Sequence, residues 1–190
     1  MDDFTGDGLL DIVTSTYDPR GSLTFYRNDG DGTFTDASPS AGITDQLGGL
    51  NCIAADYDND GDLDIYVCGY NARKQDPVSR GLPFPVPYHD ADNGGENHLL
   101  RNDGEFVFTG VTEQVGLEQN NNRFSFAASW EDYDDDGDMD LYVANDFGRN
   151  CLYRNDGGTF VDVAANADVE DHASGMSVSC AAWLPWSVTV

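Results

Sequence analysis

Short runs in which hydrophobic and polar residues alternate recur along the chain, and turn residues separate them. The runs Leu63–Val67 and Met139–Val143 each follow an Asp-rich string, whereas the runs LTFYR and CLYR each precede Asn-Asp-Gly. A period of two, rich in Tyr, Val and Phe and bounded by Asp-Gly, is typical of strands and hairpins. Helical spacing occurs only near Val111–Val115 and Val163–Asp168, over very few residues. The pattern therefore predicts an all-β protein.

Two strings recur three times each. The first is DFTGDGLLD from Asp3, DYDNDGDLD from Asp56 and DYDDDGDMD from Asp132, and the second is the Asn-Asp-Gly that follows Arg27, Arg101 and Arg154. The repeating unit is about 53 residues long, which is typical of an array of supersecondary units. We place the repeats at about 1–50, 51–127 and 128–178, with 179–190 as the truncated start of a fourth.

The middle repeat carries an insertion at residues 70–96. This stretch holds four of the seven prolines and three of the nine basic residues. Because proline cannot donate a hydrogen bond to a β-ladder, the stretch cannot be a central strand. We expect a surface excursion from one repeat and not a linker between domains.

The Asp-rich string has the donor pattern of a calcium loop. In the second copy, carboxylates occupy positions 1, 3, 5 and 9, and a glycine at position 6 permits a sharp turn. Alternate positions on a curling loop point to one centre, and position 7 can add its backbone carbonyl. Five or more hard oxygen donors suit Ca²⁺, which takes six to eight flexible ligands. We predict about three ions, held by Asp56, Asp58, Asp60, Asp62 and Asp64, by Asp132, Asp134, Asp136, Asp138 and Asp140, and by Asp3, Thr5, Asp7, Leu9 and Asp11.

Three alternatives fit the acidic strings less well than this calcium loop does. They are a solvated turn, an EF-hand and a compact acidic repeat. A single such string could be a solvated turn, but three at a fixed phase, each followed by a strand, favour a cation. An EF-hand requires a bidentate Glu at position 12, where this chain has Thr14, Val67 and Val143. Compact acidic repeats would lack the long strand-rich spacing. The first loop is the weakest candidate, because Thr5 replaces a carboxylate at position 3.

The nine-residue DxDxDGxxD loop between strands resembles the FG-GAP repeat of integrin α-subunit β-propellers and the related VCBS-type bacterial repeats. The run Val143–Ala164 is similar to the repeats of cartilage acidic protein and its bacterial relatives, with Phe147 and Gly148 as the Phe-Gly element. The resemblance implies four-stranded blades around a channel, with calcium in each full loop. Closed propellers have about four to eight blades. With about three repeats, residues 1–190 are therefore expected to form one incomplete propeller.

The charge balance excludes several classes of partner. The chain has 35 Asp or Glu residues against nine Lys or Arg, for a net charge of −26. Nucleic acids and anionic membrane surfaces require basic patches, so we expect neither as a partner. The apolar tail from Met176 is interrupted by Ser, Thr and Pro and is shorter than the about 20 residues of a membrane span.

The sequence offers no catalytic signature. It contains no GxSxG, HExxH, P-loop or dinucleotide-binding motif, and His89, His98 and His172 are isolated from one another. We expect a non-enzymatic, calcium-stabilised module that binds an extracellular protein or glycan. The alternative is an accessory propeller of a larger carbohydrate-active enzyme. No signal peptide follows Met1 in this chain, so the secreted or cell-surface assignment depends on the calcium argument.

Two expectations concern covalent and quaternary structure. If Asp56 lies opposite Asp64, then Cys52 lies opposite Cys68, either as a disulfide or as two small residues in a tight core. Cys151 and Cys180 are expected to be free. Three blades leave two uncovered ends, so we also expect the chain to self-associate or to be marginally stable.

Overall fold

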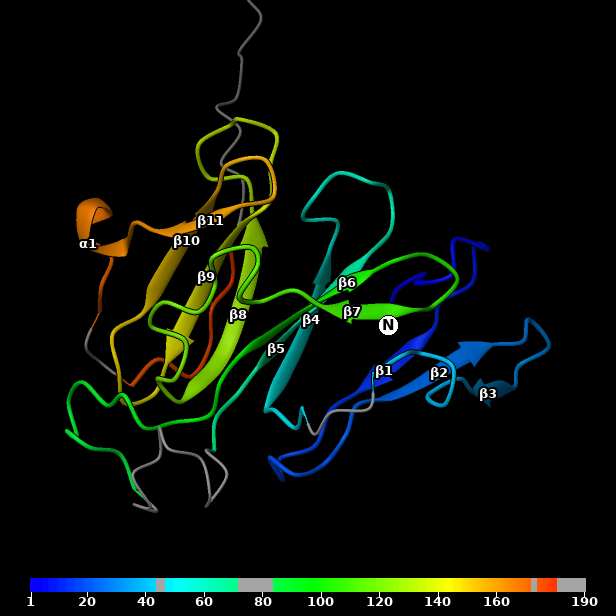
Figure 1. The fold of residues 1–190 in the computed structure, drawn as a ribbon, viewed down its shortest axis with the longest axis horizontal. Helices are drawn as coiled ribbons and strands as arrows, with labels where there is room; N and C mark the ends of the chain where they lie inside the picture. Colours follow the sequence, from blue (N-terminus) through cyan, green and yellow to red (C-terminus); the bar gives the residue numbers. More distant parts are fainter. Residues whose placement is uncertain (44–46, 72–83, 172–173, 181–190) are drawn as a thin grey trace, which may run out of the picture.

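The computed structural model describes residues 1–43, 47–71, 84–171 and 174–180, and shows three antiparallel sheets side by side (Figure 1). We call the sheets blades 1, 2 and 3 in chain order. Blade 1 has the strand order β1-β2-β3, blade 2 β4-β5-β6-β7 and blade 3 β8-β9-β10-β11. The described residues are thus all-β with almost no helix, as predicted, and the sheets do not close into a barrel.

The strands of blade 1 are β1 (Ile12–Thr14), β2 (Thr24–Asn28) and β3 (Phe34–Asp36). Blade 2 consists of β4 (Asn51–Ala55), β5 (Asp64–Cys68), β6 (His98–Asn102) and β7 (Phe108–Gly110). Blade 3 consists of β8 (Ser125–Glu131), β9 (Asp140–Asn145), β10 (Cys151–Asn155) and β11 (Phe160–Asp162), and α1 (Ala164–Ala167) follows. The alternating runs and the Asn-Asp-Gly turns lie where the sequence predicts strands and hairpins.

The hydrophobic core lies between neighbouring blades. Blade 2 is covered on both sides, and β5 is buried along its whole length. Ile65 and Val67 pack toward blade 1, whereas Tyr66 and Cys68 pack toward blade 3. Because successive side chains of a strand point to opposite faces, one short apolar run serves two interfaces. The blades therefore depend on one another for burial.

The pairing of β4 with β5 differs by one residue from the prediction. Ala55 pairs with Asp64, so Cys52 pairs with Val67 and not with Cys68. A shift of one residue moves every side chain to the opposite face of the sheet, because the side-chain period is two. The predicted alignment of the two cysteines is therefore wrong.

The same shift occurs in blade 3, where Ala128 pairs with Val143 and Ala127 with Ala144. In both blades, the last residue that pairs before the acidic loop is therefore the one that precedes its first Asp, namely Ala55 and Glu131. A symmetric hairpin would pair that Asp itself.

All four thiols are free. Cys52 is half-buried and packs against the core between blades 1 and 2, whereas Cys68 is buried in the core between blades 2 and 3. No disulfide joins them. The expectation that Cys151 and Cys180 are free is confirmed.

Part of the insertion and most of the proposed fourth repeat lie outside the described residues, namely 72–83 and 181–190. The described end of the insertion returns to blade 3, where the Ala91 N–H donates to the Phe147 carbonyl at 2.8 Å. No helix among the described residues is long and apolar enough to cross a membrane.

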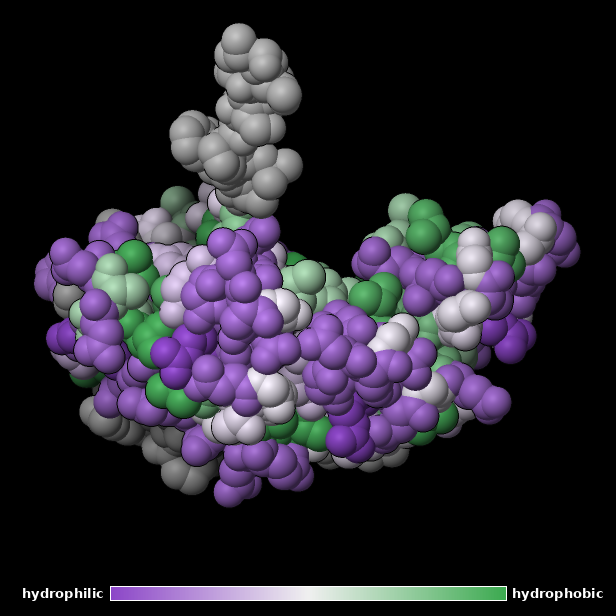
Figure 2. Space-filling view, turned by 90° about the horizontal axis from the view of Figure 1, so that it is seen from above, coloured by the Kyte–Doolittle hydropathy of each residue, from purple (hydrophilic) through white to green (hydrophobic). Residues whose placement is uncertain are grey.

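The surface is mostly hydrophilic, with scattered hydrophobic residues and an open, crescent-like outline (Figure 2). Three sheets packed side by side and left open at both ends form an incomplete propeller. The acidic loops between β4 and β5 and between β8 and β9 project from one end of their blades, and the insertion lies at the opposite end (Figure 1).

Candidate metal loops

The three acidic loops share one backbone conformation. Position 6 has a left-handed φ in every copy, of 86°, 97° and 95° at Gly8, Gly61 and Gly137. Position 4 is also left-handed, and it is filled by Gly or by Asn and Asp, the residues that tolerate this region best. The sharp turn that the sequence predicts at the glycine is therefore present three times.

The carboxylate at position 1 organises the turn. The Asp56 Oδ1 accepts the Asp60 N–H, and its Oδ2 accepts the Gly61 N–H, both at 3.0 Å. Asp132 and Asp3 accept the equivalent pairs at 2.8 to 3.1 Å. The Gly8 N–H is the main cause of the lowered pKa of Asp3. These bonds fix the curl of each loop before any ion is considered.

The carboxylate at position 9 is buried and joins three segments of its blade. The Asp64 Oδ2 accepts the Tyr57 N–H at 3.0 Å, and its Oδ1 accepts the Asn102 N–H at 2.9 Å. Asp140 and Asp11 make the same two kinds of bond at 2.8 to 3.1 Å. Burial raises the pKa of Asp64 to about 7, although both backbone N–H groups lower it. Position 9 is therefore a structural hub as well as a predicted ligand.

Two of the loops bring three carboxylates together. One oxygen each from Asp56, Asp58 and Asp64 lie within 4.8 Å of one another, and so do oxygens from Asp132, Asp134 and Asp136. Clusters of this size suit a hard divalent cation. The predicted ligands Asp60 and Asp140 fall outside these two groups. Asp60 and Asp136, at position 5, each accept the N–H of position 7 at 2.9 Å.

In the second loop, Asp58 has the environment that best fits a bound cation. Its Oδ1 is buried and has no hydrogen-bond partner. Burial raises the pKa of Asp58, and the neighbouring Asp60 and Asp56 raise it further. A buried carboxylate oxygen without a donor is costly unless a cation neutralises it. The residues present therefore fit a bound cation.

The first loop differs in its chemistry. Asp3, Asp7 and Asp11 do not form a close carboxylate group within the described residues. The Thr5 hydroxyl, at position 3, lies 3.5 Å from the Asp3 Oδ1. The Asp7 Oδ1 accepts the N–H of Leu9 at 2.8 Å, as position 5 does in the other loops. This loop has the shared backbone curl with fewer charged donors.

The second and third loops touch one another. The Asn59 Nδ2 donates to the Asp138 Oδ1 at 2.8 Å, and the Gly157 N–H donates to the Asp138 Oδ2 at 2.7 Å. Only the backbone carbonyl of Asp138 is a predicted ligand, so its side chain can serve this contact. The two candidate sites are therefore linked through one carboxylate.

The Asn of each Asn-Asp-Gly has a role that its sequence pattern alone does not reveal. Its Oδ1 accepts an N–H two or three residues later, as a turn requires. In Asn102 and Asn155 the Nδ2 also joins neighbouring blades: that of Asn155 donates to the Tyr57 carbonyl of blade 2 at 2.7 Å and to the Met139 carbonyl at 3.1 Å. Asn102 donates in the same way to Phe4 of blade 1 at 3.0 Å. The recurrence of Asn at one phase is the only signal of this role in the sequence.

Replacing Asn155 by Ala should lower the free energy of unfolding by about 2–4 kcal/mol, because it removes the donor to the Tyr57 carbonyl in a buried bond and to the Met139 carbonyl in a part-buried one. Urea unfolding followed by circular dichroism measures the change. Asn28→Ala is the matched control, since the Asn28 Nδ2 donates only within its own blade, to Leu10. Equal losses from the two changes would contradict a role between blades.

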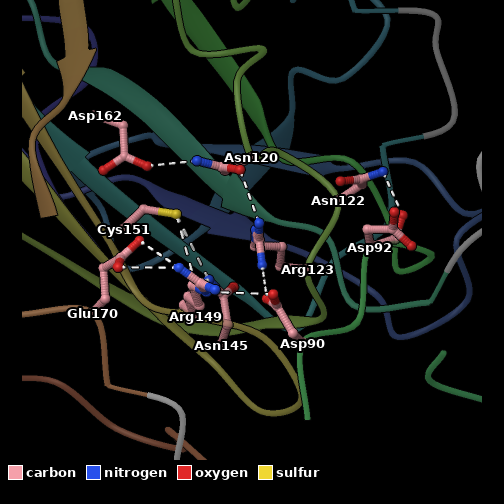
Figure 3. A network of polar contacts seen from close by, with 10 residues as sticks. All are labelled: Asp90, Asp92, Asn120, Asn122, Arg123, Asn145, Arg149, Cys151, Asp162 and Glu170. Carbon is pink, nitrogen blue, oxygen red and sulfur yellow. Dashed lines mark hydrogen bonds and ion pairs between the residues drawn. The ribbon is translucent and has the colours of Figure 1, made fainter. Parts of the chain in front are cut away.

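A second polar cluster lies near the insertion (Figure 3). Arg123 and Arg149 both contact the Asp90 carboxylate, and the Arg149 Nη1 lies 3.2 Å from the Glu170 Oε2. Asn120 accepts a hydrogen bond from Arg123 at 2.9 Å. These ion pairs fasten the end of the insertion to blade 3, although the Arg123 Nε is buried without a hydrogen-bond partner among the described residues.

The histidines do not contribute to the acidic groups of the described residues. His98 begins β6 and is half-buried, as expected for a strand residue. His89 packs against the ring of Tyr88 at a centroid distance of 5.2 Å. His172 lies outside the described residues.

Comparison with known families identifies the repeat. Residues 3–67 and 132–183, more than half of the chain, match the family described as an FG-GAP-like repeat. The matched ranges contain all three acidic loops. No curated protein matches the chain, so the finer similarity to cartilage acidic protein stays a prediction. With its three blades and repeated loops, the chain belongs to the FG-GAP-like repeat family.

Proposed function

We propose that the chain is a calcium-binding repeat module of a secreted or cell-surface protein, with a binding role and no catalysis of its own. The observation that carries the proposal is the Asp56–Asp58–Asp64 group, in which a buried oxygen of Asp58 has no hydrogen-bond donor. A cation would supply the missing partner. The Asp132–Asp134–Asp136 group supports a second ion, and the first loop a weaker third.

The donor chemistry favours calcium over magnesium. The loops offer carboxylates, a hydroxyl and backbone carbonyls on a curved backbone, which fits the irregular coordination of Ca²⁺. Mg²⁺ requires a tighter octahedron and releases its waters reluctantly. Sites of moderate affinity fill only where calcium is near millimolar, which supports a location outside the cytosol.

The proposed role of the ions is structural. Each loop joins the innermost strand to the next strand in blades 2 and 3, and position 9 ties that loop to the Asn of the following turn. An ion at the centre would neutralise the clustered carboxylates and order that end of the blade. We propose that this ordered end and the blade surfaces present contacts to an extracellular protein or glycan.

Isothermal titration of the chelated protein with calcium tests the proposal. We expect uptake of two to three ions, with about 10⁻⁵–10⁻⁴ M affinity. Asp58→Asn should remove one of the stronger ions. Glu118→Gln is a charge-matched control, because Glu118 is exposed and lies outside the loops. No calcium uptake by the folded protein, or the same loss in both variants, would refute the proposal.

A further inference from the structure

The second and third acidic loops are joined by a side-chain contact across the junction of blades 2 and 3. The Asn59 Nδ2 donates to the Asp138 Oδ1 at 2.8 Å, and these two residues lie 79 positions apart in the chain. The other oxygen of the same carboxylate, Oδ2, accepts the N–H of Gly157 at 2.7 Å. Hydrogen bonds to an ionised acceptor are stronger than those between neutral groups. Asp138 therefore holds both the neighbouring loop and the turn of its own blade.

Each partner in this contact lies among the predicted ligands of its own loop. Asn59, at position 4, stands between Asp58 and Asp60 and has a left-handed φ of 59°. Asp138, at position 7, carries a predicted backbone ligand, and its N–H donates to the Asp136 Oδ1 at 2.9 Å. An ion that fixes either loop would therefore also fix the residue that the other loop contacts.

A second set of contacts lies beside the first. The Asn155 Nδ2 donates to the carbonyl of Tyr57, at position 2 of the second loop, and to that of Met139, at position 8 of the third. The turn after Asn155 also packs on the second loop, since a Cβ added at Gly158 would lie 3.8 Å from the Cβ of Asp58. The two loops thus share a border along positions 2 to 4 of one and 7 to 8 of the other.

The junction between the first and second loops has only part of this border. Asn102 makes the equivalent pair of bonds there, to the carbonyls of Phe4 and Leu63 at 3.0 and 3.3 Å. Position 4 of the first loop is Gly6, however, which has no side chain to offer to Asp62, the position-7 residue of the second loop. The chain therefore contains one junction with a side-chain link between loops and one without it.

We propose that the second and third loops bind their ions cooperatively, and that the contact between Asn59 and Asp138 carries the coupling. This inference rests on the calcium binding proposed above. Ordering a loop costs conformational entropy, and the loop that binds first fixes the shared contact for both. The next ion then binds a loop that is already partly ordered. By linkage, each ion should raise the affinity of the other loop by the same factor, about three- to tenfold for one such contact.

Calcium titration of the calcium-free full chain, followed by NMR, resolves the loops from one another. The amides of Gly61 and Gly137, at position 6, report on the second and third loops, and that of Gly8 reports on the first. Asp134→Ala removes one carboxylate of the third group and so weakens that site. It should raise the calcium concentration at the Gly61 midpoint by about three- to tenfold and change the Gly8 midpoint much less.

Asn59→Gly separates the contact from the other effects of a neighbouring ion. The first loop already has Gly at position 4, and a left-handed φ suits glycine. In the Asn59→Gly background, Asp134→Ala should move the Gly61 midpoint by less than about twofold, as expected for independent sites. Repulsion between the ions and the loss of one charge are the same in both backgrounds, so the difference between them isolates the contact.

A second pair of variants tests the other partner. Asp138→Ala should uncouple the loops as Asn59→Gly does. Asp62→Ala is its matched control, because both changes remove one charge at position 7 and keep the backbone carbonyl, but Asp62 faces the loop that has Gly6 at position 4. Equal effects of the two changes on the coupling would contradict a role for the contact with Asn59.

The outcomes distinguish this inference from the calcium proposal. The titrations are run under conditions in which circular dichroism confirms that each variant is folded. If both loops bind calcium but Asp134→Ala shifts the Gly61 midpoint equally with and without the Asn59 side chain, or in neither case, the inference is wrong and calcium binding stands. If neither Gly61 nor Gly137 responds to calcium, the calcium proposal fails and the inference fails with it. Reciprocity adds a check, since Asp58→Ala should move the Gly137 midpoint by a similar factor.

Discussion

Removal of calcium should lower the free energy of unfolding by about 4–8 kcal/mol, the largest effect that we expect from any single change. At about 1 mM calcium, an ion bound with about 10⁻⁵–10⁻⁴ M affinity contributes about 1.4–2.7 kcal/mol. Three ions approach the about 5–15 kcal/mol by which an ordinary domain is stable. The chelated chain should therefore be close to unfolding at ambient temperature.

The structural reason is the arrangement of charge in the loops. Asp56, Asp58 and Asp64 hold oxygens within 4.8 Å of one another, and the chain carries a net charge of −26. Without a cation, these carboxylates repel one another in partly buried surroundings. Differential scanning calorimetry with calcium, with EDTA and with EDTA plus excess magnesium measures the effect.

Magnesium and the first loop provide the controls for this prediction. Magnesium should restore only a small part of the lost stability, because the loops do not impose a tight octahedron. Thr5→Ala should reduce the calcium-dependent stability less than Asp58→Asn, since Thr5 contributes a hydroxyl and no charge. An equal response to magnesium and calcium, or no response to EDTA, would contradict the prediction.

The repeated strands are predictable because their pattern is local. Runs such as Leu63–Val67 alternate with a period of two and are bounded by turn residues, which suffices to predict a strand in each repeat. The loop conformation is equally predictable, since Gly61 and Gly137 mark the left-handed turn. Both features depend on neighbouring residues alone.

The strand register could not be predicted because it depends on how the loop closes. Pairing Asp56 with Asp64 assumes a symmetric hairpin, but both oxygens of the Asp64 carboxylate accept backbone N–H groups, from Tyr57 and Asn102. Pairing instead starts at Ala55. One residue of difference separates Cys52 from Cys68 and removes the possible disulfide.

The contacts between blades also could not be predicted from the sequence. Asn155 donates to Tyr57, which lies 98 residues earlier, and nothing local distinguishes this bond from an ordinary Asn-Asp-Gly turn. The sequence likewise does not show that Asp140 lies outside the carboxylate group that Asp136 joins. Long-range packing sets the contact between Asn155 and Tyr57.

The second large effect is a dependence of stability on pH that calcium reverses. Burial raises the pKa of Asp64 to about 7 in the folded chain, against about 3.9 for an aspartate in an unfolded chain. A raised pKa in the folded state contributes stability below the unfolded pKa, and this stability is lost as pH rises through the folded pKa. Calcium-free protein should therefore lose stability between about pH 4 and pH 7, by about 4 kcal/mol at most for this group.

Other carboxylates change the pH dependence of stability, some in the same direction as Asp64 and some in the opposite one. Burial also raises the pKa of Asp140 and Asp58, which adds to the loss. Hydrogen bonds lower the pKa of Asp31 and Asp36, which are exposed, so their opposing contribution is screened by solvent. The buried groups therefore determine the sign.

Calcium should reverse the slope because it binds only the ionised carboxylates. As pH rises from about 4 to 7, protons leave the loops, the affinity for calcium increases and the folded state gains binding free energy. Stability should then rise with pH in about 1–5 mM calcium and fall with pH in EDTA, in the same protein and the same buffers. Urea unfolding at half-unit pH steps under both conditions measures the two slopes. If stability rises with pH in EDTA, Asp64 stays ionised without a cation and the prediction is wrong. If stability changes with pH in the same direction in EDTA and in calcium, the buried carboxylates are not the groups that bind calcium.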